Sequence, residues 1–283
     1  MGGAAVSMRI ARVFPVETAA TPKDELSYID CEPGLFVPDV DEVHISVTFT
    51  WHIKRAEKLA KAWACVAPVK IGGPAFNAPG SEFVPGMYVK KGYVITSRGC
   101  PNNCWFCAVP KREPKLIELP IVEGFNVIDD NLLACSESHI RNVFGMLLRR
   151  KSSRLMQRAE FTGGLEAARL KDWHVELLSR LKPKQMFFAF DTPEDEEPLR
   201  CASIKLLEAG FTPTSHTLRC YVLIGYPGDR FEKAVHRLNL CLQLGFTPMA
   251  MLWHDDKGCT INAEWRAFQR SWVRPAIIHS RNQ

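Results

Sequence analysis

The sequence contains no run of about 18 consecutive apolar residues, which excludes the usual pattern of a transmembrane helix. Its first residues lack the long apolar stretch of a secretory signal peptide. An N-myristoylation signal begins with Met-Gly and has Ser or Thr at position 6. This chain begins with Met1-Gly2 but has no Ser or Thr at position 6, so it does not match that signal. Internal repeats and low-complexity segments are absent as well. We therefore expect a globular cytoplasmic protein that has no membrane anchor.

A strong excess of charge of one sign is lacking too. The net charge is only +5, which by itself does not indicate a nucleic-acid partner. The densest basic patch combines Arg149, Arg150, Lys151, Arg154 and Arg158. We interpret this patch as a solvated helix end followed by a loop, and contact with a polyanion is the alternative.

Cysteine, by contrast, is plentiful: the chain has ten cysteines, and three of them lie within eight residues. In a reducing compartment, clustered cysteines indicate a metal centre or catalysis rather than disulfides. The other seven are scattered and mostly flanked by apolar residues. We interpret the scattered cysteines as small buried hydrophobic side chains.

The first part of the chain, residues 1–92, is expected to form a small α/β extension. Residues 1–41 show no clear period, so we expect an irregular segment with one short strand at most. The pattern then predicts a strand over 43–49, a helix over 51–64 and a parallel strand over 69–73. Residues 74–92 are rich in proline and glycine and are expected to link this extension to the next domain.

The second part, residues 93–283, alternates strand and helix patterns and ends in a tail. This alternation predicts a partial (βα)6 barrel of parallel strands with helices outside. The first crossover, residues 108–125, holds three prolines and is expected to be an irregular loop. The expected strands are 93–96, 126–128, 158–162, 185–190, 219–224 and 248–252, and the expected helices are 138–149, 171–181, 198–209 and 231–244.

Polar or glycine-rich residues follow each of the expected strands. In α/β folds the ligand lies at the carboxyl ends of the strands, so these segments are expected to converge on one site. The segments begin at Cys100, Asp129, Gly163, Asp191, Gly225 and Trp253.

The cysteine segment reads Cys100-Pro-Asn-Asn-Cys104-Trp-Phe-Cys107, a C-x3-C-x2-C spacing on a loop after a strand. Soft thiolates at this spacing can hold a compact iron–sulfur centre. Three ligands would leave one iron open for chemistry. The motif, with Phe106 just before the last cysteine, resembles the signature of the radical S-adenosylmethionine (radical SAM) superfamily.

This resemblance implies that Cys100, Cys104 and Cys107 bind a 4Fe–4S cluster whose open iron chelates SAM. Reductive cleavage of SAM would give a 5′-deoxyadenosyl radical that abstracts hydrogen from a substrate, with electrons from flavodoxin or ferredoxin. The resemblance further implies SAM contacts from the remaining strand ends. Phe106 and the Gly225 backbone are the candidate contacts of the adenine, Asp191 of the ribose and Arg219 of the carboxylate. The candidate contacts of the amino group are Asp129, Asp130 and Asn131. A second candidate set for the amino group is Gly163, Gly164 and Glu166.

Alternatives remain open at this point. The three cysteines and a distant fourth ligand could form a zinc- or iron–sulfur-stabilised binding module without catalysis. The substrate of an enzyme could be a nucleoside or nucleic acid, or a small metabolite or peptide. Residues 43–76 weakly resemble the cobalamin-binding domain found upstream in one radical SAM branch. The D-x-H-x-x-G motif of that domain is absent, so we expect no cobalamin.

Overall fold

The computed structural model describes residues 8–77, 83–152, 157–255 and 262–272. The chain divides into two compact units, Met1–Tyr93 and Val94–Gln283, which we describe separately. None of the described helices combines the length and the apolar character needed to cross a membrane.

The first unit is built on a four-stranded sheet in the order β2-β1-β3-β4, in which every neighbouring pair is parallel. The predicted strand–helix–strand segment is confirmed as β3, α1 and β4. The expectation for residues 1–41 is wrong in part, because this segment holds two strands of the sheet, β1 and β2, where one short strand was expected. The elements are β1 (Ile10–Phe14), β2 (Ser27–Ile29), β3 (Glu42–Ser46), α1 (Ile53–Trp63) and β4 (Val69–Gly72).

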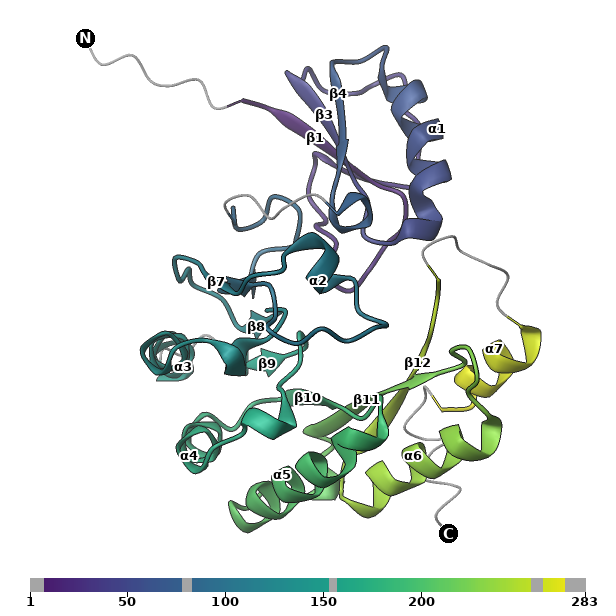
Figure 1. The fold of residues 1–283 in the computed structure, drawn as a ribbon. Helices are drawn as coiled ribbons and strands as arrows, with labels where there is room; N and C mark the ends of the chain where they lie inside the picture. Colours follow the sequence, from purple (N-terminus) through teal and green to yellow (C-terminus); the bar gives the residue numbers. More distant parts are fainter. Residues whose placement is uncertain (1–7, 78–82, 153–156, 256–261, 273–283) are drawn as a thin grey trace. The chain divides into compact units, whose positions relative to one another are not determined.

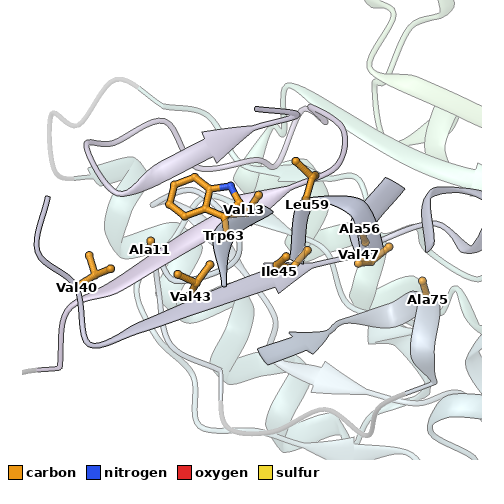
Figure 2. Packing of buried hydrophobic residues seen from close by; sticks show 10 residues of the cluster. All are labelled: Ala11, Val13, Val40, Val43, Ile45, Val47, Ala56, Leu59, Trp63 and Ala75. Carbon is orange, nitrogen blue, oxygen red and sulfur yellow. The ribbon is translucent and has the colours of Figure 1, made fainter. Parts of the chain in front are cut away.

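One face of α1 forms the core of this unit with the sheet. Ala56, Leu59 and Trp63 recur at helical spacing and are fully buried. Figure 2 shows them beside the buried valines and isoleucine of β1 and β3. The indole of Trp63 donates a hydrogen bond to the Cys31 carbonyl oxygen at 3.0 Å, so its one polar group remains satisfied.

The second unit is built on a six-stranded sheet in the order β12-β11-β10-β9-β8-β5, and the ladders from β8 to β12 are parallel. The order has two ends, so the described strands form an open sheet rather than a closed barrel. All six predicted strands are found, although several are shorter than expected. They are β5 (Tyr93–Val94), β8 (Asn126–Val127), β9 (Glu160–Phe161), β10 (Gln185–Ala189), β11 (Leu218–Ile224) and β12 (Thr247–Leu252).

Helices cover one face of this sheet (Figure 1). Along β11, alternate residues from Leu218 to Ile224 are buried, and Cys220 interacts with Cys241 of α6. The four predicted helices are confirmed within a few residues. They are α3 (Glu137–Ser152), α4 (Asp172–Leu181), α5 (Glu196–Glu208) and α6 (Phe231–Gln243).

Two connections differ from the expectation. The segment 108–125 contains the one-turn helix α2 (Val109–Arg112), and strands β6 (Ser97–Arg98) and β7 (Ile117–Glu118) form an antiparallel ribbon around it. An unpredicted helix, α7 (Ala263–Arg270), packs Trp265 against Phe231 of α6 with ring centroids 4.2 Å apart. Short 3-10 turns occur at Thr50–His52, Pro74–Phe76, Leu132–Ala134, Ala167–Arg169, Pro193–Asp195 and Pro213–Ser215.

The scattered cysteines divide into two groups. Cys135, Cys220 and Cys241 are buried, as expected, because they face the helix–sheet interior. The expectation is wrong for Cys31, Cys65 and Cys201, whose segments lie at the surface. Cys259 lies outside the described residues.

Candidate functional site

The cysteine loop follows β5 and β6 and turns sharply at Gly99. The φ angle of Gly99 is +81°, and a Cβ atom there would lie 2.7 Å from the Lys115 carbonyl carbon. Only glycine therefore fits this turn. The loop then closes on itself, since the Cys107 amide donates a hydrogen bond to the Cys104 carbonyl oxygen at 3.0 Å.

The three loop thiols share one electrostatic environment. Partial burial of this otherwise exposed residue raises the pKa of Cys104, and negative charge on Cys107 or Cys100 raises it further. Burial also raises the pKa of Cys107, while a hydrogen bond from the Val109 amide opposes this effect. Bringing three thiolates together without a cation is thus unfavourable, and a bound cationic centre would relieve this repulsion.

Asp129, at the end of β8, anchors the start of the cysteine loop. Its carboxylate accepts hydrogen bonds from the Thr96 amide and hydroxyl, both at 2.6 Å, and from the Ser97 hydroxyl at 2.8 Å. The residue is only 2% exposed, and burial raises its pKa against these hydrogen bonds. Both carboxylate oxygens already accept hydrogen bonds from the protein, so Asp129 holds the loop in place and is not open to a ligand.

Asp130 continues this anchoring one residue later. Its carboxylate accepts a hydrogen bond from the Gly99 amide at 2.8 Å and from the Arg112 guanidinium at 3.0 Å. Asp130 therefore ties the residue before Cys100 to the helix after Cys107. Nothing in the spacing of Arg112 in the sequence indicated this role.

Asn131 and Glu166 meet beside Cys100, although they follow different strands. The Asn131 amide nitrogen lies 3.3 Å from the Cys100 sulfur and 2.6 Å from Glu166 Oε2. Glu166 also accepts from Arg169 at 2.6 Å. The Oδ1 atom of Asn131 is buried and accepts no hydrogen bond within the described residues. An unpaired buried acceptor beside a cysteine favours a ligand with a hydrogen-bond donor at this point.

The two glycines before Glu166 differ in their surroundings. A Cβ atom at Gly163 would lie 2.6 Å from the Ile128 carbonyl carbon and 2.7 Å from the Asp129 nitrogen. Gly163 thus allows the ends of β9 and β8 to approach each other. Gly164 has open space where a Cβ would be, and its φ angle of +104° favours glycine.

Asp191 follows β10 and is half-buried. Its Oδ1 atom accepts a hydrogen bond from the Leu223 amide of β11 at 2.8 Å. Burial raises its pKa to about 7, and the charge of Arg237 partly opposes this shift. The negative charges of Asp191 and Asp195 also contribute to the raised pKa of Cys104, so this strand end belongs to the same site.

Gly225 begins the turn after β11, and the turn is internally closed. The Gly225 amide donates to Asp229 Oδ2 at 2.9 Å, and Asp229 pairs with Arg237 of α6 at 3.1 Å. A Cβ atom at Gly225 would lie 2.9 Å from the Leu252 side chain. These contacts explain the Gly225 and Asp229 residue types by the packing and closure of the turn.

Arg219 does not join the other candidates. It is the second residue of β11, and about 16 Å of strand separates it from Ile224 at the carboxyl end. Its guanidinium donates to the His216 carbonyl oxygen at 3.3 Å and lies 5.6 Å from the Phe187 ring centroid. The expected pairing with a SAM carboxylate is therefore corrected, because Arg219 lies at the wrong end of its strand.

Trp105 contacts three other aromatic side chains, of which Phe106 alone was predicted from the sequence to contact a ligand. Trp105 lies 5.4 Å from Phe106, 5.6 Å from Tyr226 and 6.4 Å from Trp253 between ring centroids. We call Trp105, Phe106, Tyr226 and Trp253 the aromatic group. The sequence signal that could have identified these residues is their position, either next to a motif cysteine or at the end of a strand.

The basic patch near the end of α3 is mainly occupied with local contacts. Arg158 donates to the Lys182 and Pro183 carbonyl oxygens at the end of α4, and Arg150 pairs with Glu123 at 3.6 Å. Cations at helix carboxyl termini complement the helix dipole. Arg154 lies outside the described residues.

Among the described residues, no group of three or more His, Cys, Asp or Glu side chains is arranged to hold a metal ion. This result applies to sites for a single metal ion and not to iron–sulfur clusters. Thiolates on one zinc ion all lie about 2.3 Å from the same point, whereas thiolates on an iron–sulfur cluster bind different irons. Comparison with known proteins found no matching family model and no matching curated sequence.

Proposed function

We propose that this chain is a radical SAM enzyme with a partial (βα)6 barrel as its catalytic domain. The observation that carries the proposal is the convergence of Asn131 and Glu166 on Cys100, the first residue of the C-x3-C-x2-C motif. A SAM-binding cluster needs both soft thiolates and polar groups for the amino acid part of SAM. Both kinds of group occur here at the carboxyl edge of one parallel sheet.

The donor set of the site fits a 4Fe–4S cluster. Cys100, Cys104 and Cys107 would hold the cluster, since thiolates are the ligands that such clusters take. The Asn131 N–H group lies at 3.3 Å from the Cys100 sulfur, where it would stabilise negative charge on that ligand. The cluster with SAM would supply reductive cleavage of the sulfonium bond and a 5′-deoxyadenosyl radical that abstracts hydrogen from the substrate.

The protein side chains would bind and orient SAM. The free Oδ1 atom of Asn131 would accept from the SAM ammonium group, and the adjacent Glu166 carboxylate would favour its positive charge. The Gly164 backbone would allow close approach. Asp129 and Asp130 would act indirectly, by fixing the loop that carries the cysteines.

The exposure of the cysteine loop and the position of Asp191 bear on electron delivery and on SAM binding. Cys104 is exposed, so a small electron carrier such as flavodoxin or ferredoxin could approach the cluster from the side of the loop. Asp191 is half-buried beside β11, where it would face the ribose of the bound SAM. Its raised pKa would let it donate a hydrogen bond near neutral pH.

Anaerobic purification followed by reduction in the presence of SAM tests the proposal. We expect a brown protein that contains iron and sulfide and forms 5′-deoxyadenosine and methionine with dithionite. The Asn131→Ala variant should keep its iron and bind SAM about tenfold more weakly, because one hydrogen bond to a charged group is lost. A colourless zinc protein that does not bind SAM would instead support the non-catalytic binding module.

A further inference from the structure

Helix α7 follows the last strand of the sheet and carries its aromatic residues on one stripe. Trp265 and Phe268 lie at positions i and i+3 of the helix, and Trp272 follows at i+7. Trp265 and Phe268 are half-buried and Trp272 is buried, whereas Glu264 and Arg266 beside them are exposed. Residues at this spacing share one face of a helix, so α7 presents a single apolar side to the rest of the unit.

This stripe docks α7 on both α6 and β12. The rings of Trp265 and Phe268 lie 4.2 Å and 5.4 Å from the ring of Phe231 in α6, measured between centroids. The Gln269 side-chain amide donates a hydrogen bond to the Ala250 carbonyl oxygen of β12 at 3.2 Å. Because β12 is an end strand of the sheet order, this hydrogen bond also satisfies a carbonyl group of an edge strand. Contacts with two separate elements therefore fix the position of α7.

Trp265 reaches the turn that follows β11. A Cβ atom at Gly225 would lie 3.1 Å from Trp265 Cδ2 and 3.2 Å from Trp265 Cγ, so the indole packs directly against the glycine. The φ angle of Gly225 is +72°, and a glycine has no side chain that could hold its own backbone in place. The neighbours of Gly225 must do this, namely the Asp229 carboxylate, the Leu252 side chain and the indole of Trp265. The position of the Gly225 backbone therefore depends in part on α7.

We propose that Trp265 is a positioning residue for recognition of the SAM adenine. It would hold the Gly225 backbone at the place where that backbone contacts the base. Without the indole, the turn could relax into the vacated space, and hydrogen bonds between backbone and base weaken steeply when their geometry is lost. This inference rests on the proposed function, because it concerns the SAM site. It adds to that site a residue of α7 that determines selectivity for the base.

Binding of SAM and of S-inosylmethionine to anaerobically purified, iron-loaded protein tests the inference. In S-inosylmethionine a carbonyl oxygen replaces the 6-amino group of the base, so backbone groups that fit adenine meet the wrong partner. We expect the wild-type protein to bind SAM about tenfold more tightly than the analogue. Trp265→Ala should reduce this ratio to about twofold or less, with its iron content unchanged. Trp265→Phe should keep most of the ratio, because an aromatic ring still covers Gly225.

Two control variants separate base recognition from general damage. Asn131→Ala should weaken both ligands equally and so keep the ratio, because it acts at the SAM amino group. Phe268→Leu is the matched packing control: Phe268 packs on the same ring of α6, but the atoms nearest to a Cβ at Gly225 belong to Leu252 and Trp265. It should keep the ratio as well.

Three results would overturn the inference while SAM binding, and with it the proposed function, stands. They are an unchanged ratio in Trp265→Ala, a wild-type protein that does not distinguish the two ligands, and an equal loss of the ratio in Phe268→Leu. Failure of the iron-loaded wild-type protein to bind SAM at all would instead overturn the proposed function, and this inference with it.

Discussion

The two units both contain parallel sheets, but they use carboxylates in different ways. In the first unit, Asp24 pairs with Arg12 and Asp30 with Arg55, and both acidic side chains are about half exposed, at 48% and 55%. In the second unit, Asp129 is buried and Asp191 is half-buried, and both accept hydrogen bonds from backbone amides of a neighbouring strand or loop. Surface pairs contribute little to stability, whereas buried carboxylates constrain the backbone around them.

This difference shows that the fold class alone does not locate chemistry. The same strand–helix–strand arrangement carries an ordinary surface in one unit and a convergent polar site in the other. What differs is the set of residues at the carboxyl ends of the strands.

The largest expected effect separates the cysteines of the loop from the other cysteines. Cys104→Ala should reduce the iron content of anaerobically prepared protein to background, because two thiolates cannot retain the cluster. Cys201→Ala is the control, since Cys201 is exposed on α5. Iron and sulfide determination measures the result. Full iron retention in Cys104→Ala would overturn the ligand assignment.

A second prediction compares the glycines at strand ends in the two units. A Cβ at Gly73 would lie 2.7 Å from the Val47 carbonyl oxygen, and one at Gly163 would lie 2.6 Å from the Ile128 carbonyl carbon. Both glycine-to-alanine variants should lower the free energy of unfolding by about 3 kcal/mol, because backbone atoms cannot yield easily. Denaturant unfolding measures this loss.

The two glycine variants should differ in iron content. Gly163→Ala should also reduce iron binding, since it displaces Asp129 and with it the cysteine loop, whereas Gly73→Ala should not. Gly145→Ala in α3 is the control and should be neutral or stabilising by up to about 1 kcal/mol, because alanine favours helix and the site is open. Equal iron loss in both variants would argue against a separate role for the second unit.

The last expected effect is a pH dependence specific to the half-buried carboxylate of Asp191. The pKa of Asp191 rises from 3.8 to about 7 in the folded protein. Between these values the folded state retains a proton that the unfolded state loses, so the free energy of unfolding falls as the pH rises. The total fall is on the order of a few kcal/mol and is complete above the folded pKa.

Asp191→Asn should remove this part of the pH dependence and keep the acceptor for the Leu223 amide. Denaturant unfolding of both proteins at about pH 5 and about pH 8 measures the difference. Asp30→Asn in the first unit should not change the pH dependence in this range. A constant difference between wild type and Asp191→Asn across pH would contradict the burial argument.

Most helices and strands were predictable because their apolar residues recur at regular spacing. Strand β1 was missed because Arg12 interrupts its apolar run, and this arginine is buried only through Asp24 and the Gly86 and Met87 carbonyl oxygens. Those partners are distant in sequence. Helix α7 was missed because only its aromatic residues pack, while most of its surface is polar.

The candidate site was predictable in part. The spacing of the three cysteines indicated a metal centre directly, since adjacent ligands on one loop need no tertiary information. The prediction for Arg219 was wrong because this residue lies near the beginning of its strand and not at the carboxyl end. The exposure of Trp105 was not predictable, because an aromatic residue beside a cysteine has no local signature of exposure.

By itself, the sequence determined the cysteine triad and the alternating strands and helices, because both depend on short-range spacing. Only the tertiary structure decided that Glu166 reaches Asn131, that Asp129 is fully engaged, and that Arg219 lies at the opposite end of its strand. The physical reason is that parallel strands bring residues far apart in the chain to a common edge, and the register of each strand sets which side chains arrive there.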